Sequence, residues 1–130
     1  MTDYAAMDNQ TLRRMIAEKL GYLQVHTTSL DGIPIVYIQD VWGKHINSDW
    51  PESVDAAKRL FEPLPENHQL TMKFHWKSRT WIVGLERYED NTTASKPIDC
   101  YGLAIAEDNE LARAICLAFL AWSDSKEKAK

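Results

Sequence analysis

The apolar residues near the start of the chain are spaced three or four positions apart, which is the period of one face of a helix. They are Leu12, Met15, Ile16 and Leu20. Asp8 or Asn9 precedes this stripe and offers a side chain that can cap the first turn. Gly21 follows it, and glycine readily ends a helix in the left-handed conformation. The pattern predicts a first helix that ends at Gly21.

The next segment changes from helical spacing to alternation. Residues 22–27, YLQVHT, alternate as expected of a half-buried strand, and a β-branched run covers residues 33–38. The dipeptide Asp31-Gly32 lies between them and favours a tight turn. The pattern predicts a first β-hairpin.

A second helix is expected to open within residues 48–64, SDWPESVDAAKRLFEPL. Asp49, with Glu52 three positions later, has the pattern of a capping box, and Pro51 suits a first turn. Pro63 and Pro65 are expected to close this helix. Its apolar stripe consists of Val54, Ala57, Leu60, Phe61 and Leu64.

A second hairpin is predicted by HQLTMKFHW at 68–76 and TWIVGLERY at 80–88. Residues 89–99 are expected to form an exposed loop, and CYGLAIA at 100–106 to add a short strand. A last helix is expected to begin near Asp108, and the polar residues after Trp122 are expected to fray. The apolar stripe of this helix consists of Leu111, Ile115, Ala118, Phe119 and Trp122.

Hairpins that alternate with helices predict an α+β fold. We expect a mostly antiparallel sheet packed with helices, an αββαββα sandwich, rather than a doubly wound parallel sheet. The length predicts one sandwich domain over residues 1–122, followed by a flexible polar tail over residues 123–130.

Several short stretches resemble the phage ABA-sandwich domain family. In that family an early helix ends in an LGY-like stretch, here KLGY at 19–22. An Asp-aromatic pair precedes a helix with paired alanines, here DWPESVDAAKRL at 49–60. A hairpin with tryptophan follows, and AICLAFLA at 114–121 resembles the last helix. The resemblance covers nearly the whole chain and implies a phage or prophage origin.

Most members of that family have no assigned activity. Similar small phage folds include the Thoeris anti-defence proteins, which sequester a cyclic nucleotide-derived immune signal without cleaving it. By this analogy, the resemblance implies a non-enzymatic anti-defence sponge for a small nucleotide-derived signalling molecule in the cytoplasm of a host cell.

Charge and composition narrow the classes of partner. The 130-residue chain has 19 Asp and Glu against 15 Lys and Arg, a formal net charge of −4, which argues against binding long nucleic acid or an anionic membrane. No apolar run approaches the roughly 20 residues of a membrane span. Residues 1–10 lack the basic and apolar regions of a signal peptide. We therefore expect a cytoplasmic protein with no membrane partner.

The residue types of common catalytic and metal sites occur without the spacing that such sites need. The histidines show no HxH or HxxxH pattern, and no CxxC is present, so we expect no metal and no cofactor. No GxSxG occurs, and neither Cys100 nor Cys116 has neighbours that suggest an activated thiol. The sequence therefore predicts a protein that is not an enzyme. The four histidines are His26, His45, His68 and His75.

One stretch reverses the local charge. Residues 73–87 carry four Lys or Arg and one Glu, a local charge of about +3 in an acidic protein. Cations beside indole rings suit a nucleotide, because aromatic faces stack on a base and cationic groups neutralise phosphate. The alternative is an ordinary hairpin that packs Phe74 and Trp76 against helices and leaves Lys77 and Arg79 in solvent. The candidate ligand-binding residues are Trp42, Lys73, His75, Trp76, Lys77, Arg79, Arg87 and Arg113.

Two of these candidates lie outside the basic stretch. Arg113 is near the start of the last helix, where the helix dipole favours anions, and its alternative role is to pair with Asp108, Asn109 or Glu110. Trp42 lies in a loop, where an indole serves as a ligand platform or as an anchor for a protein interface.

Two functions remain open at this point. The first is a phage-derived sponge for a cyclic nucleotide-type immune signal, with a pocket at the boundary between subunits of a homo-oligomer. The second is a phage-derived protein-interaction module that binds a host or phage protein through Trp42 and the tip of the second hairpin. Convergence of Lys73, Arg79, Arg87 and Arg113 on one cavity favours the first, and an exposed apolar patch favours the second.

Overall fold

The computed structural model describes residues 4–62, 68–90 and 98–128. Five helical segments and six strands lie within these ranges. The helical segments are η1 (Tyr4–Ala6), α1 (Asn9–Leu20), α2 (Val54–Lys58), η2 (Arg59–Phe61) and α3 (Leu111–Lys128). The strands are β1 (Gln24–Leu30), β2 (Ile33–Gln39), β3 (His45–Ile46), β4 (His68–His75), β5 (Thr80–Asp90) and β6 (Ile98–Asp108).

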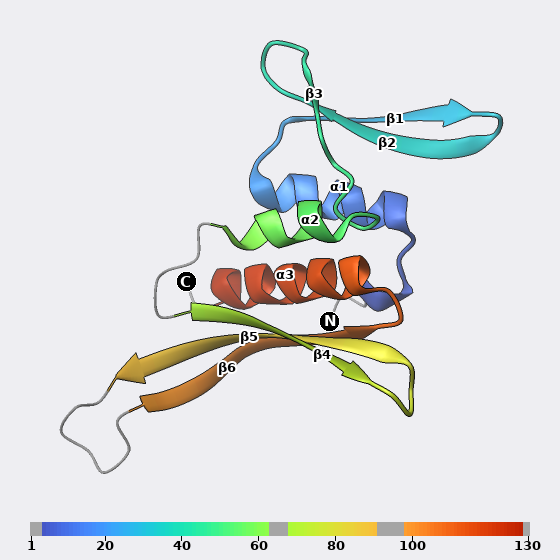
Figure 1. Ribbon diagram of the computed structural model, residues 1–130. Helices are drawn as coiled ribbons and strands as arrows, with labels where there is room; N and C mark the ends of the chain where they lie inside the picture. The colour runs from blue at the N-terminus through green and yellow to red at the C-terminus, as the bar shows by residue number, and fades with distance from the viewer. Residues whose placement is uncertain (1–3, 63–67, 91–97, 129–130) are drawn as a thin grey trace.

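The strands form two separate three-stranded antiparallel sheets, in the orders β1-β2-β3 and β4-β5-β6. The helices lie between them (Figure 1). Helix α3 packs on β5 and β6 on one side and on α1 and α2 on the other, while α1 packs on β1 and β2. The predicted α+β class is therefore confirmed. The two hairpins belong to separate sheets, a point that the sequence left open, because the helical layer lies between them.

Helix α3 is the centre of the hydrophobic core. Every residue from Ala114 to Leu120 is buried, so the helix is apolar around its whole circumference and not only along the stripe read from the sequence. Small side chains such as Ala114 and Ala118 allow close approach of the neighbouring layers. Phe119 meets Phe61 edge to face, with ring centroids 5.8 Å apart.

The first helix and the first hairpin form as the sequence predicts. Asp8 caps α1, because its carboxylate accepts a hydrogen bond of 2.8 Å from the Thr11 backbone N–H. Gly21 ends the helix with φ of 89°, in the left-handed region. Asp31 and Gly32 both have positive φ, 53° and 80°, as a type I′ turn between two strands requires.

The start of the second helix differs from the prediction. Helix α2 begins at Val54 with Ser53 as its cap, so the capping box that we expected from Asp49 is wrong. Residues 49–53 form a turn instead, in which the Asp49 carbonyl accepts from the Ser53 N–H at 2.8 Å. The Glu52 carboxylate is bound to Arg13 and is not available to a capping box. The predicted helix end at Pro63 and Pro65 lies outside the described residues.

Strand β6, the third strand of the second sheet, is longer than expected. Strand β6 pairs with β5 as far as Asp90 opposite Ile98, so the exposed loop predicted over 89–99 is too wide at both ends. Because Asp108 is the last residue of β6, helix α3 begins at Leu111 rather than near Asp108.

The C-terminal helix also continues beyond the point where we expected it to fray. Helix α3 runs to Lys128, and Asp124 accepts a hydrogen bond of 2.6 Å from the Tyr4 hydroxyl. Asp124 also pairs with Lys19 at 2.8 Å. These contacts hold the helix against the N-terminal segment past Trp122, so the polar tail is helical up to Lys128. None of the helices in the described ranges is long and apolar enough to cross a membrane.

Candidate functional site

The tip of the second hairpin, residues 75–80, presents its charged side chains to solvent. Lys77 and Arg79 are exposed, and Arg79 has φ of 55° within the turn. Trp76 contacts Phe74 edge to face at 4.8 Å but remains 82% exposed. The alternative in which Trp76 packs against the helices is therefore wrong, because the strand ends before Trp76 and the turn carries it away from the core.

Four polar side chains connect this tip to the neighbouring strand. The His75 Nδ1 and Ser78 Oγ atoms are 2.8 Å apart, and Ser78 Oγ lies 2.7 Å from Thr80 Oγ1. The Glu107 carboxylate on β6 accepts from both Ser78 and Thr80. In a serine triad the acid orients the histidine, whereas here the carboxylate contacts the hydroxyl groups, and the group is open to water. The arrangement stiffens the turn.

The sheet reduces the positive charge that the sequence places at this tip. Glu107 and Asp108 lie on β6 directly opposite Ile82 and Trp81 of β5. When these two carboxylates are added to the count together with Arg113, which pairs with Asp108, the local charge falls from about +3 to about +2. The stretch is therefore less basic in space than along the chain, although its net charge remains positive.

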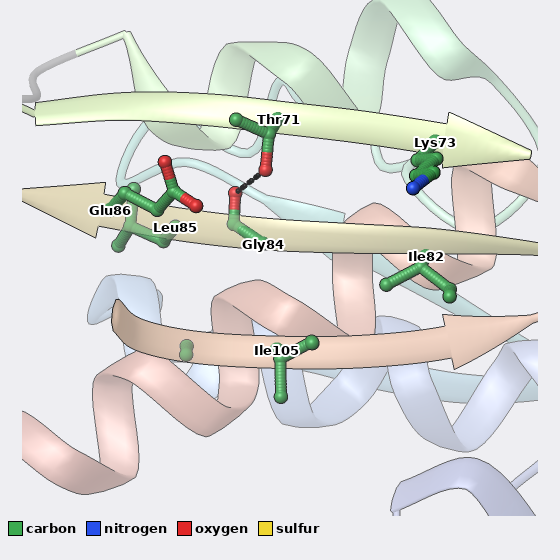
Figure 2. Close-up of a pocket in the computed structure, with 8 residues that line it drawn as sticks. Thr71, Lys73, Ile82, Gly84, Leu85, Glu86 and Ile105 are labelled. Carbon is green, nitrogen blue, oxygen red and sulfur yellow. Dashed lines mark hydrogen bonds between the residues drawn. The ribbon is translucent and has the colours of Figure 1, made fainter. Parts of the chain in front are cut away.

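A shallow cavity of about 580 Å³ lies on the face of the second sheet that points away from the helices. Figure 2 shows Lys73 and Glu86 at opposite ends of the cavity. Between them, the Thr71 hydroxyl donates a hydrogen bond of 3.2 Å to the Gly84 carbonyl. Ile105 is 72% exposed at its side. Lys73 is the only predicted ligand-binding residue in its lining, which consists of Thr71, Lys73, Ile82, Gly84, Leu85, Glu86, Ala104 and Ile105.

The two remaining cationic candidates lie elsewhere. Arg87 of β5 is opposite His68, the first residue of β4, and lies five residue pairs from the pair that contains Lys73, or about 17 Å along the strand. Arg113 donates to the Met7 carbonyl at 2.9 Å and to Asn9, and pairs with Asp108 at 3.5 Å. The alternative role for Arg113, a partner for Asp108, is confirmed, since its guanidinium ties α3 to the N-terminal segment.

The four cations that the first function requires in one cavity therefore do not meet; they are Lys73, Arg79, Arg87 and Arg113. A second cavity of about 410 Å³ lies where α1, α2 and α3 begin, but its charged lining residues are Glu52 and Glu110. These carboxylates offset the positive helix ends and make the cavity unfavourable for an anion.

In the part of the chain that the structure describes, no group of three metal-ligating side chains is present. Burial raises the pKa of the Cys116 thiol well above its usual range, which keeps it in the unreactive protonated form.

Trp42, the last candidate, lies in the turn between β2 and β3. The Asp40 carboxylate accepts from the backbone N–H groups of Trp42 and Lys44, at 2.8 and 2.9 Å. The Asp40 N–H donates to the Lys44 carbonyl at 2.9 Å, and Gly43 adopts φ of 80°. The turn is thus fixed by its own hydrogen bonds while the Trp42 side chain is 89% exposed.

Exposed apolar side chains gather around this turn. Val41 is 79% exposed, and the pairing of Gln24 with Gln39 places Leu23, 94% exposed, beside Asp40. We call this group the apolar end of the first sheet; its members are Leu23, Val41 and Trp42. The sequence analysis found Trp42 but missed Leu23, whose only sequence signal is its place between a helix stop and a strand.

Comparisons with known proteins found no matching family model, no matching curated protein and no matching solved structure.

Proposed function

We propose that this protein is a non-enzymatic protein-interaction module that binds its partner through the apolar end of the first sheet. The observation that carries this proposal is Trp42, which is 89% exposed on a turn held by internal hydrogen bonds. An isolated exposed apolar residue is common on protein surfaces. Several adjacent ones around a fixed indole are typical of an interaction site.

The rigidity of the turn favours tight binding. Ordering a side chain or a loop on association costs free energy, and a loop that is already fixed by hydrogen bonds loses less conformational entropy. Trp42 and Val41 can therefore enter an apolar hollow of a partner without reorganising the Asp40 turn. Tryptophan is among the residues that most often dominate interface energies. The expected partner surface is an apolar hollow wide enough for an indole ring.

The experiment compares Trp42→Ala with Trp76→Ala. Both tryptophans are more than four-fifths exposed on hairpin turns, at 89% and 82%, so they are matched in type and exposure. Partners captured by the wild type from a bacterial lysate are identified and purified, and their dissociation constants are measured. We expect Trp42→Ala to raise the dissociation constant by about 30-fold or more, while Trp76→Ala leaves it within about 3-fold.

Both variants are expected to keep the wild-type melting temperature within about 2 °C, because neither side chain contributes to the core. The proposal fails if binding survives Trp42→Ala, or if Trp76→Ala weakens it as much. It also fails if no protein binds the purified chain.

A second candidate function is sequestration of a cyclic nucleotide-type immune signal by a phage-derived protein. It is supported by the resemblance described above and by Trp76, which is 82% exposed between Lys77 and the histidine of the same turn, His75. The carboxylate of Glu107 beside the tip and the dispersion of the cations make it the less favoured of the two.

This second function is tested by thermal shift against cyclic di- and trinucleotides and cyclic ADP-ribose isomers. Any ligand is then released by heat denaturation and identified by mass. Intact recovery, together with a 10- to 100-fold loss of affinity in Arg79→Ala, is the expected result for a sponge. Recovery of a cleaved product contradicts it and indicates an enzyme, and the absence of any shift excludes the ligands tested.

A further inference from the structure

The two sheets have four outer edges, and three of them carry features that discourage pairing with another strand. Strand β3 has only two residues. Strand β4 carries Lys73, and β6 carries acidic residues at both ends. Short length and charge are the usual means by which sheet edges avoid uncontrolled pairing. Strand β1, with the sequence QVHTTSL, has seven residues and contains neither a charged residue nor a proline.

The backbone groups on the free edge of β1 can be assigned. The Val36 N–H donates to Gln10 Oε1 at 2.7 Å, and the Val36 carbonyl accepts from Arg13 at 3.2 Å. These groups therefore point away from β1. Val36 is paired with Thr27. In an antiparallel ladder such a pair directs the backbone groups of both residues outward, so Thr27 presents its N–H and C=O to the open edge.

The alternation of the ladder extends this assignment to Val25 and Ser29. The hairpin geometry agrees with it, because Ser29 is paired with Pro34, which has no N–H to donate to β1. Three residues of β1 thus offer outward N–H and C=O groups along an uncharged edge. Within the described residues, β2 is the one strand that pairs with β1.

One charged residue of the helical layer, Arg14, approaches Thr27. The Thr27 side chain lies on the same face as its pair partner Val36, which is buried against the helices. Arg14 of α1 reaches the Thr27 hydroxyl from that covered face. Its guanidinium therefore lies on the inner side of the sheet rather than in the plane of the edge.

We propose that β1 pairs antiparallel with β1 of a second copy of this chain, about a two-fold axis at Thr27. In this register Thr27 meets Thr27, and Val25 meets Ser29, so each outward residue faces an outward residue. The three pairs provide about six backbone hydrogen bonds and join the two sheets into one continuous sheet. A second copy is the favoured occupant because the strand is self-complementary: β1 itself contains no Lys, Arg, Asp or Glu that would face its own copy, and threonine pairs are favourable across strands.

The same register places the exposed side chain of Leu30 next to a residue of the second copy. Leu30, which is 62% exposed in one copy, lies opposite Gln24 of the other. The next residue along that face is His26, which already stacks on Tyr37 at 5.0 Å. The contact thus extends a row of rings on the outer face of the first sheet. It uses an edge separate from Trp42 and leaves the apolar end free for the partner proposed above.

The first test removes one outward donor without touching the β1–β2 ladder. In Thr27→Pro, the lost N–H is one that points to the open edge, so the hairpin should persist in the circular dichroism spectrum. Sedimentation equilibrium of the wild type is expected to show a dimer. The dimer dissociation constant is expected to rise by about 30-fold or more in Thr27→Pro, because both copies lose a bond at the axis.

The second test checks the register and remains informative if Thr27→Pro does not fold. Q24K/L30K places like charges opposite each other at both ends of the interface, whereas Q24K/L30E places opposite charges there. The two variants differ only at residue 30. We expect Q24K/L30K to be monomeric and Q24K/L30E to remain dimeric at 50 mM salt, with the difference narrowing at high salt.

Trp42→Ala serves as the control, since it is expected to weaken partner binding and leave the dimer mass unchanged. A wild type that sediments as a monomer at about 100 µM overturns the proposal, because the uncharged edge would then be unpaired at concentrations where weak dimers form. A dimer with equal dissociation constants in wild type, Thr27→Pro and both charge variants also overturns it.

Discussion

Arg13 shows how a single buried cation connects three parts of the fold. Arg13 follows Leu12 of the apolar stripe of α1, and it is only 8% exposed although it is charged. Its Nη2 group contacts both oxygens of Glu52 at 2.7 Å, and its Nε donates to the Ser48 carbonyl at 2.8 Å. Two further bonds from Nη1 reach the Val36 carbonyl of β2 and the Gln10 side-chain oxygen. Each donor of the planar guanidinium is thereby used, which is what allows a charge to be buried at this junction.

Replacing the carboxylate tests this connection. Glu52→Gln keeps the size of the side chain but removes the negative charge opposite Arg13, so we expect the free energy of unfolding to fall by about 1.5 kcal/mol. Glu52 is partly exposed, which limits the loss below that of a fully buried pair. Urea denaturation measures the change. Glu18→Gln, an exposed change on the outside of α1, is the control and should alter stability by less than about 0.5 kcal/mol.

Several residue roles were not predictable because they depend on neighbours far along the chain. The Arg113 guanidinium is hydrogen-bonded to Met7 and Asn9 and paired with Asp108. Its sequence environment showed Asp108, Asn109 and Glu110 as nearby partners, not the N-terminal carbonyl groups. Trp76 is exposed because β4 ends at His75, one residue before it. Sequence alternation assigns a residue to a face, but it does not say where the covered part of the strand stops.

At the scale of elements, local signals were reliable. The Asp8 cap and the Gly21 stop of α1 are both confirmed, since a cap depends on residues within one turn of the helix. The Asp31-Gly32 turn forms for the same reason. Helix α2 is the exception: two caps, Asp49 and Ser53, compete within five residues, and the contact of Glu52 with Arg13 favours Ser53.

The Asp8 cap gives α1 a dependence on pH. Hydrogen bonds from Thr11, the backbone N–H first, lower the pKa of the Asp8 carboxyl below its usual value. A lowered folded-state pKa means that the stabilisation is present above the unfolded pKa, about 3.9, and is lost as the pH falls through the folded pKa. The charged cap therefore contributes fully at neutral pH and not in strong acid.

Two substitutions separate the cap from its charge. At pH 7 we expect Asp8→Ala to lower the free energy of unfolding by about 1 kcal/mol, and Asp8→Asn to lower it by less than about 0.5 kcal/mol. The difference between wild type and Asp8→Ala should shrink from pH 4 to pH 2, whereas the difference between Asp8→Asn and Asp8→Ala should not change. Chemical denaturation across this range measures both. A wild-type difference that stays constant with pH contradicts the proposed cap chemistry.

At the scale of the molecule, the layers distribute stability unevenly. Helix α3 is enclosed by β5 and β6 on one side and by α1 and α2 on the other (Figure 1). The far part of the first hairpin, by contrast, is exposed from Thr27 to Pro34. Opening the hairpin end uncovers little apolar surface, but opening α3 requires the separation of every layer. The enclosed helix and the projecting hairpin should thus differ in local stability.

Hydrogen exchange measures this difference. We expect the amides of residues 114–120 to exchange only through global unfolding, and those of residues 28–35 to exchange at least about 100-fold faster in dilute protein. The amides of β5, which are covered by α3 and bonded to strands on both sides, serve as the internal reference. Equal protection of the hairpin and α3 would contradict a core centred on α3.

The sequence by itself determined the element types, the α+β class, the α1 caps and the first hairpin turn. These features depend on the spacing and identity of residues a few positions apart, so the information is contiguous in the chain. It also identified Trp42, Lys77 and Arg79 as exposed residues of turns, since turn signals are equally local.

Only the tertiary structure decided that the strands form two sheets around a central helix, that Glu107 and Asp108 lie beside the basic tip, and that four cations do not share a cavity. It also decided that, among the residues that the structure describes, no strand pairs with the outer, uncharged edge of β1, while the other edges are short or charged. The physical reason is the same in each case. Burial, charge neutralisation and strand pairing are set by groups brought together from distant parts of the chain, and periodicity along the sequence does not contain those distances.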